Sequence, residues 1–178
     1  SIRRRQRQMC IRDSINPKTQ LKMLQTLAEA AGYRGMAAGQ TIDFNAKGKI
    51  LSIVELEKMH KLKTGALIKA AVRLGALSHP GVKETELDAL EMYATKIGLA
   101  FQVRDDILDG IIATDVLGKP QGSDQAHGKP TYLSRAGLKA ARTKTDILAN
   151  EAISALESFS ASADPLRELA EYVVRRDH

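Results

Sequence analysis

The stretch ETELDALEMYATKIGLAFQVRDDILDGI, residues 84–111, decides the fold because apolar side chains recur in it every three or four positions. This spacing places them on one face of an α-helix, whereas a half-buried strand would alternate apolar and polar residues. The stretch therefore predicts one long amphipathic helix with a buried face. The positions on that face are Leu87, Leu90, Ala94, Ile97, Phe101, Ile107 and Leu108.

Similar patterns on both sides of this stretch predict further helices and no strand. The expected helices are residues 17–31, 35–44, 53–77, 134–158 and 165–176. Ser52 and Glu55 fit a capping box at the start of the third of these. The second is rich in small residues, which predicts close packing against a neighbouring helix. We therefore predict an all-α fold, and 178 residues favour a single domain with one core.

A long segment without periodicity, residues 113–131, separates the long helix from the closing helices and is punctuated by Gly and Pro. Segments of this length inside a compact domain are more often functional than idle. Lys119 and Lys129 stand beside glycines in it, where lysines can fold over a phosphate group. Solvated loop lysines are the common alternative, and both interpretations remain open on the residues alone.

Composition excludes several classes of protein. One cysteine cannot form an intramolecular disulfide scaffold, and no apolar run approaches the ~20 residues that a membrane-spanning helix needs. No apolar stretch follows the N-terminal charges, so a secretory signal is not expected. Few aromatics, 4%, and abundant Ala, Leu, Lys and Glu are typical of helices. We predict a soluble, cytoplasmic protein.

The net charge of +6 comes mostly from the N-terminal stretch SIRRRQRQMCIRDS, residues 1–14. Five arginines and one aspartate lie there, so the remainder of the chain carries only +2. Such a stretch can form a nucleic-acid-binding arm. No basic or aromatic groove pattern follows it, however, and its composition breaks off at Asn16-Pro17. We therefore interpret residues 1–14 as an appended, non-native segment such as a translated adaptor, and we expect no nucleic-acid partner.

Three carboxylates gather in the apolar stretch quoted first. On a helix, Asp105, Asp106 and Asp109 lie within about 100° of one another, with Gln102 in the same sector. Like charges at this spacing cost about 0.2–0.5 kcal/mol per pair, and a divalent cation would relieve the repulsion. Oxygen ligands suit Mg²⁺, which also binds substrate phosphates. The alternative is a solvated acidic face. The four histidines show no metal-ligand spacing.

A second polar group lies at Lys63-Thr64, within the expected helix 53–77. At helical spacing, Lys63 falls on the same stripe as the apolar residues of that helix, so its ammonium group is expected to be partly buried. The side chain can extend its charged end to water, or it can meet an anionic partner inside the protein. The middle of a long helix favours the internal partner. Carboxylates and lysines together indicate a diphosphate site inside a helical bundle.

Four segments in order resemble signatures of the polyprenyl diphosphate synthase family, closest to the bacterial farnesyl diphosphate synthases. They are GMAAGQTIDF (35–44), KMHKLKTGALIKAAVRLGAL (58–77), GLAFQVRDDILD (98–109) and VLGKPQGSDQAHGKPTY (116–132). The resemblance runs from about Leu21 to the C-terminal YVVRR. An ordered series of matches is a far stronger signal than one aspartate-rich motif alone. Arg104 departs from the pattern, since relatives usually have a neutral or small polar residue there.

The resemblance implies a helical bundle with a central cavity, in which Mg²⁺ ions link two aspartate-rich helices to an allylic diphosphate. It implies a prenyltransferase that joins dimethylallyl or geranyl diphosphate to isopentenyl diphosphate and forms farnesyl diphosphate. A homodimer is the usual assembly. The implied metal ligands are Asp105, and Asp106 and Asp109 either directly or through water. The implied residues for the allylic diphosphate are Lys63, Thr64, Lys119 and Lys129. Those near the isopentenyl group or lining the site are Phe101, Gln102, Gln40 and Asp43.

The family's first aspartate-rich motif and its upstream isopentenyl-binding residues have no counterpart in this sequence. We therefore expect residues 15–178 to be the C-terminal part of one synthase domain and the chain alone to be inactive. Two alternatives remain. The chain could be a non-catalytic subunit that associates with an active synthase, or a helical bundle with incidental charge. The aspartate motif and the lysines argue against both, because neither role needs them.

Overall fold

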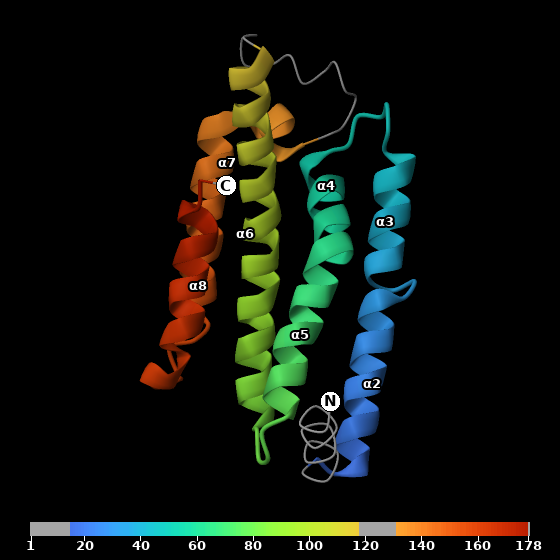
Figure 1. Ribbon diagram of the computed structural model, residues 1–178, viewed down its shortest axis with the longest axis vertical. Helices are drawn as coiled ribbons and strands as arrows, with labels where there is room; N and C mark the ends of the chain where they lie inside the picture. Colours follow the sequence, from blue (N-terminus) through green and yellow to red (C-terminus); the bar gives the residue numbers. More distant parts are fainter. Residues whose placement is uncertain (1–14, 118–130, 178) are drawn as a thin grey trace, which may run out of the picture.

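The computed structural model describes residues 15–117 and 131–177, with residues 112–117 described by their backbone alone. Within these ranges the chain forms helices and no strand (Figure 1). Long α6 stands in the middle, with α7 and α8 on one side and α4 and α5 on the other, followed by α2 and α3. The elements are α2 (Pro17–Ala31), α3 (Met36–Asn45), α4 (Ile53–His60), η1 (Lys61–Gly65), α5 (Ala66–Leu77), α6 (Glu84–Leu117), α7 (Tyr132–Ser154), η3 (Ala161–Ala163) and α8 (Asp164–Arg175).

The all-α prediction is confirmed, and helix starts follow the local sequence closely. Asn16 caps α2 by accepting the amide of Thr19 at 2.9 Å, and Pro17 occupies the first helical turn. At α4, the Ser52 side chain accepts the amide of Glu55 while the Glu55 carboxylate accepts the amide of Ser52 at 2.8 Å. This is the capping box expected from the sequence.

Two expected helices have different bounds in the structure. Helix α6 continues to Leu117, beyond residue 111, so the segment without periodicity begins later than residue 113. Helix α7 starts at Tyr132 and ends at Ser154, whereas we expected 134–158. It also contains a break, because Gly137 has a φ of 78° and a ψ of 162°, which only glycine adopts readily. The spacing of apolar residues predicts neither these helix ends nor the break, since helix ends depend on caps and packing.

The expected helix 53–77 is helical throughout, but its middle is a π-helical turn, η1. A π turn holds one more residue than an α turn, so the side chains after it are rotated relative to uniform 3.6-residue spacing. Such turns occur mostly as single interruptions of α-helices and often at functional sites. Lys63 and Thr64 both lie in this turn.

Glycines let two helices approach η1 very closely. A Cβ atom added to Gly39 of α3 would lie 2.1 Å from the backbone nitrogen of Lys63. On the other side, a Cβ added to Gly98 of α6 would lie 3.2 Å from the Cα of Gly65. The small residues of α3 thus serve the close packing that the sequence predicted. Helices α3 and α6 hold η1 between them.

The core lies where α6 packs against α4, α7 and α8. Its largest fully buried side chains are Tyr93, Leu56, Ile107, Leu156 and Val103. Tyr93 donates its hydroxyl proton to the carbonyl of Leu166 in α8 at 2.8 Å, and burial raises the pKa of this tyrosine to about 12. The apolar face predicted for residues 84–111 is therefore the centre of the core.

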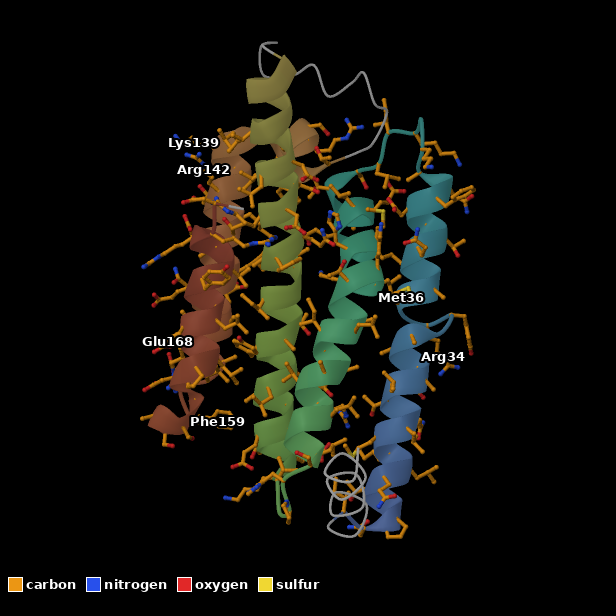
Figure 2. All side chains as sticks on the ribbon, in the orientation of Figure 1. Arg34, Met36, Lys139, Arg142, Phe159 and Glu168 are labelled. Carbon is orange, nitrogen blue, oxygen red and sulfur yellow. The ribbon has the colours of Figure 1, made fainter. Side chains whose placement is uncertain are left out.

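Helix α2 is less covered than its leucine pattern predicts. Leu21 and Leu24 are 67% and 66% exposed, and no residue of α2 is buried among the described residues. At the α2–α3 connection, Met36 lies on the side that faces the continuous helix of α4, η1 and α5, and Arg34 points away from the bundle (Figure 2). In the described ranges, no helix combines the length and apolar character required to cross a bilayer.

Candidate functional site

Lys63 of η1 meets an internal anionic partner, as its position in the sequence predicted. Its Nζ pairs with Oδ2 of Asp43 in α3, and the two side chains are 30% and 17% exposed. The close approach at Gly39, one turn before Asp43, brings the carboxylate to the lysine. Lys63 thus presents a half-buried ammonium group that is held in place and still reached by solvent.

Thr64, the next residue of η1, connects this pair to α6. Its hydroxyl donates to Oε1 of Gln102 across the contact between η1 and α6. Gln102 lies one helical turn before the aspartates, so the hydrogen bond joins the Lys63-Thr64 group to the carboxylate group. The two polar groups that the sequence singled out belong to neighbouring elements.

Asp105 lies half-buried on the same side of α6 as Gln102. Burial raises the pKa of Asp105, the guanidinium of Arg176 opposes this rise, and the charges of Asp109 and Asp106 add to it. Arg176 donates to Oδ1 of Asp105, and its Cζ lies 4.2 Å from the centre of the Phe101 ring. A carboxylate whose pKa is raised by burial beside other charged groups is more often found at functional sites than on ordinary surfaces.

Asp106 has different surroundings from those of Asp105. It is 7% exposed, and its Oδ2 accepts the backbone amide of Tyr132 at 2.6 Å, at the start of α7. Nε2 of His60, a side chain that is also buried, lies 3.4 Å from the same oxygen. Asp106 therefore joins α6, α7 and the end of α4, a role for which the carboxylate's negative charge complements the N-terminus of a helix.

The three aspartates do not form a ready-made metal cage. Asp109 is exposed, and in the part of the chain that the structure describes no three acidic, His or Cys side chains are grouped closely enough to hold a metal ion. The donor type nevertheless fits Mg²⁺, because this ion is usually bound through one or two carboxylates together with water and substrate phosphates. Asp105 and Asp109 can supply such carboxylates, whereas Asp106 already has a backbone donor.

The remaining predicted residues are placed as follows. Gln40 is an exposed residue of α3, three positions before Asp43, and Phe101 is half-buried beneath Arg176. Lys119 and Lys129 lie outside the described residues, so their expected role stays a prediction.

Sequence reasoning missed His60 and Arg176. His60 was set aside because the histidines show no ligand spacing, but the structure buries it against Asp106, 46 positions later in the chain. Arg176 was part of the C-terminal resemblance without any assigned contact, and it reaches Asp105 from 71 positions away. The departure from the family pattern at Arg104 was the available signal, since this residue binds the backbone carbonyl of Arg176.

Comparison with known proteins bears on the family and the fold. The polyprenyl synthetase family model matches residues 6–171. Farnesyl diphosphate synthase of Escherichia coli is 44% identical over 166 residues, which are 92% of this chain and 56% of that protein. A putative farnesyl-diphosphate synthase structure from Marinomonas sp. MED121 is 41% identical, with a TM-score of 0.77 over 89% of this chain and 53% of that one.

A further solved structure, a geranyltransferase from Helicobacter pylori complexed with magnesium and isoprenyl diphosphate, is 27% identical, with a TM-score of 0.69 over 90% of this chain and 52% of that one. The chain thus spans about half the length of the relatives it matches. The family match begins at residue 6, inside the arginine-rich stretch, and the appended-segment interpretation of residues 1–14 stays a prediction. With nearly all of its residues matched, and with its fold shared by solved relatives, the chain belongs to the polyprenyl synthetase family.

Proposed function

We propose that the protein containing this chain is a Mg²⁺-dependent short-chain prenyl diphosphate synthase. It joins geranyl diphosphate to isopentenyl diphosphate and forms farnesyl diphosphate; starting from dimethylallyl diphosphate, two successive condensations of the same kind give the same product through geranyl diphosphate. The carbon–oxygen bond of the allylic diphosphate breaks, diphosphate leaves, and the double bond of isopentenyl diphosphate attacks the allylic cation. Loss of a proton then gives a product longer by one isoprene unit. Support comes from the family match and from the names of the similar proteins described above.

Lys63 and Thr64 bind the allylic diphosphate in this proposal. Lys63 offers a half-buried ammonium group that Asp43 keeps in place, and a partly desolvated cation attracts phosphate more strongly than one in water. The Thr64 hydroxyl can turn from Gln102 to a phosphate oxygen, since hydroxyl groups rotate freely. Lys119 and Lys129 close over the same diphosphate.

The carboxylates of α6 provide the metal ligands. Asp105 binds directly and Asp109 binds directly or through water, whereas Asp106, whose Oδ2 accepts the amide of Tyr132, contributes only through water. When bound, Mg²⁺ neutralises the charge that collects on the leaving diphosphate. Asp106 also fixes the start of α7 through the amide of Tyr132, which keeps the aspartate-bearing turn of α6 in position.

Phe101 and Gln102 lie beside the isopentenyl substrate, and Gln40 lines the site from α3. The Phe101 ring excludes water and can stabilise a neighbouring cation through its π face, as it does for Arg176 here. Excluding water matters because an allylic cation in contact with water would be captured as an alcohol.

One observation carries the proposal above all others. Thr64 of η1 and Gln102 of α6 are in direct contact, so the turn that carries Lys63 and the helix that carries the aspartates meet one helical turn from the carboxylates. Their joint position is what a Mg²⁺–diphosphate complex requires, because the metal needs carboxylates and the phosphates need cationic and hydroxyl groups.

A fusion experiment tests the activity. The chain is joined to the part of the Escherichia coli relative that it does not match, and farnesyl diphosphate formation is measured from isopentenyl and geranyl diphosphates with Mg²⁺. We expect turnover by the fusion and none by the 178-residue chain alone. Turnover by the chain alone would refute the prediction that it is inactive by itself. A folded fusion without turnover would favour the non-catalytic subunit.

Variants of the fusion locate the chemistry. Asp105→Asn and Lys63→Met are each expected to lower kcat/KM at least about 100-fold, the usual scale for removing one electrostatic contact to the reacting group. Lys139→Gln and Arg142→Gln are matched controls, because both residues lie on the outer side of α7 (Figure 2). Equal losses in controls and site variants would contradict the assignment. The homodimer and the cytoplasmic location remain predictions.

A further inference from the structure

Arg176, near the C-terminus, lies inside the candidate site. Its guanidinium pairs with Asp105 and covers the Phe101 ring, and its side chain is 14% exposed. The preceding residue, Arg175, is 77% exposed and pairs with Glu171 one turn earlier in α8. Two adjacent arginines therefore have opposite environments, and Arg176 is the one directed into the site.

Arg104 holds the backbone that carries Arg176. Its Nε donates to the carbonyl oxygen of Arg176 at 3.0 Å, and a second nitrogen of the same guanidinium donates to that oxygen as well. Arg104 also pairs with Asp177 at 3.6 Å. Because Arg104 and Asp105 are consecutive, α6 supplies both the clamp for the C-terminal segment and the carboxylate that its arginine reaches.

The bridge between Arg176 and Asp105 is not fully satisfied. Nε of Arg176 is buried and has no hydrogen-bond partner among the described residues. Leaving a buried donor unpaired costs free energy. The guanidinium thus makes an incomplete set of contacts at this carboxylate, while the Asp105 side chain is still 33% exposed. A divalent cation that arrives from solvent can therefore replace the guanidinium there.

We propose that Arg176 is the resident cation of Asp105, which neutralises this carboxylate until a divalent metal binds and which the metal must displace. The inference rests on the proposed function, because it takes Asp105 to be a metal ligand. Coulomb repulsion makes the two occupants exclusive, since a dication on the same carboxylate would lie within a few ångströms of the guanidinium. The C-terminal segment thus sets the metal affinity of the site.

Metal binding to the 178-residue chain tests this competition without any catalytic activity. The probe is Mn²⁺, which takes the same oxygen ligands as Mg²⁺ and whose free concentration is measured by electron paramagnetic resonance. Arg176→Gln is expected to lower the Kd for Mn²⁺ about fivefold, in line with the loss of one partly exposed ion pair. Arg175→Gln is the matched control and should leave the Kd unchanged.

Two further variants separate competition from packing. Arg176→Lys keeps a cation but loses the planar group over Phe101, and its Kd should return toward the wild-type value. If Arg176 acted through packing alone, the lysine variant would behave like the glutamine variant, which would overturn the inference. Asp105→Asn should weaken Mn²⁺ binding in every background.

Nuclear magnetic resonance provides a direct view of the displacement. The Nε–H signal of Arg176, identified by its absence from Arg176→Gln, should shift on addition of Mg²⁺ and exchange faster with water. NaCl at matched ionic strength should not reproduce the change. An unchanged signal at Mg²⁺ concentrations that saturate the chain would show that both cations share the carboxylate, and the inference would fall.

The two proposals fail in different ways. If Asp105→Asn weakens Mn²⁺ binding but Arg176→Gln leaves the affinity unchanged or lower, the metal site stands and the competition is refuted. If Asp105→Asn leaves Mn²⁺ binding unchanged, Asp105 is not a metal ligand, and both the competition and the proposed metal site are refuted.

Discussion

Two faces of α6 meet different surroundings at the same level of the bundle. The open face carries Asp105 and Asp109, a half-buried and an exposed carboxylate, and the closed face carries Asp106, which is 7% exposed. On the closed face the carboxylate is satisfied by the backbone amide of Tyr132. On the open face Asp105 meets the guanidinium of Arg176 and two like charges.

The difference shows that one aspartate motif serves two physical purposes. A buried carboxylate is tolerated where the fold supplies backbone donors, and it then becomes part of the structure. A carboxylate that is partly buried without such donors keeps a raised pKa, to which neighbouring carboxylates add, and a cation stabilises its ionised form. We therefore expect substitutions on the closed face to change stability and those on the open face to change metal binding.

The largest stability effect is expected for Asp106→Ala. It leaves the amide of Tyr132 without its acceptor and removes the neighbour of His60, so the free energy of unfolding should fall by about 2–4 kcal/mol. Urea denaturation followed by circular dichroism measures the change. Asp109→Ala, on the open face, should alter it by less than about 0.5 kcal/mol. Equal losses in the two variants would erase the distinction between the faces.

Gly39→Ala tests how α3 and η1, which carry Asp43 and Lys63, are held together. The added methyl group would collide with the backbone of Lys63, so α3 must move away from η1 and carry Asp43 with it. We expect a loss of about 1–3 kcal/mol in the free energy of unfolding. Gly75→Ala is the matched control, because its added Cβ meets nothing within 4 Å, and it should stabilise α5 by up to about 1 kcal/mol. Thermal denaturation of both variants decides between steric conflict and a general intolerance of alanine.

Local signals in the sequence account for most of the fold. The α2 boundaries and the Ser52–Glu55 capping box follow from residues within one turn of each other, and these are correct. The π turn at η1 was missed because it depends on the close packing of α3 and α6 on either side, and the break at Gly137 was missed because a glycine in a helical pattern does not show by itself that its φ is positive. The leucines of α2 show the limit of periodicity, which indicates an apolar face but not what covers it.

The candidate site was only partly predictable, for the same reason. Its residue types and their helical sector came from spacing, and an anionic partner for Lys63 was expected from its position. Which carboxylate it meets was not predictable, since Asp43 lies 20 positions away. The division between Asp105 and Asp106 was invisible as well, because it is set by Arg176 and Tyr132 from distant helices.

A smaller effect, of opposite sign to that of Asp106→Ala, is expected for Asp105→Asn. Its raised pKa means that folding disfavours the ionised form, and asparagine keeps an acceptor for Arg176 without the charge. At pH 7 the variant should be as stable as the wild type or more stable, by no more than about 1 kcal/mol, while its metal binding is lost. Differential scanning calorimetry beside a Mn²⁺ titration makes the comparison. A clear loss of stability would place Asp105 with Asp106 among the structural residues.

The smallest effect concerns the pH dependence of stability. The contributions of Glu57 and Asp105 to the free energy of unfolding should change with pH in opposite directions. Burial alone would raise the pKa of Glu57, but Lys144 and Lys61 outweigh it and hold this pKa below 4.5. Nζ of Lys144 lies 2.8 Å from the Glu57 carboxylate and joins α7 to α4. The ion pair of Glu57 with Lys144 contributes about 0.5–1 kcal/mol to the free energy of unfolding. This contribution is present above pH 4.5 and is lost as the pH falls through the lowered pKa of Glu57.

The contribution of Asp105 to the free energy of unfolding should change with pH in the opposite direction to that of Glu57. Its pKa is raised from 3.8, so its contribution to stability is present below that value and is lost as the pH rises through the raised pKa. Urea denaturation between pH 3 and pH 7 measures the free energy of unfolding of each variant relative to the wild type. For Glu57→Gln this difference should be negative at pH 7 and rise toward zero as the pH falls. For Asp105→Asn it should be positive at pH 7 and fall toward zero. Parallel slopes for the two variants would mean that a single environment governs both carboxylates. Opposite responses require an ionised form that lysines favour at Glu57 and an ionised form that burial disfavours at Asp105.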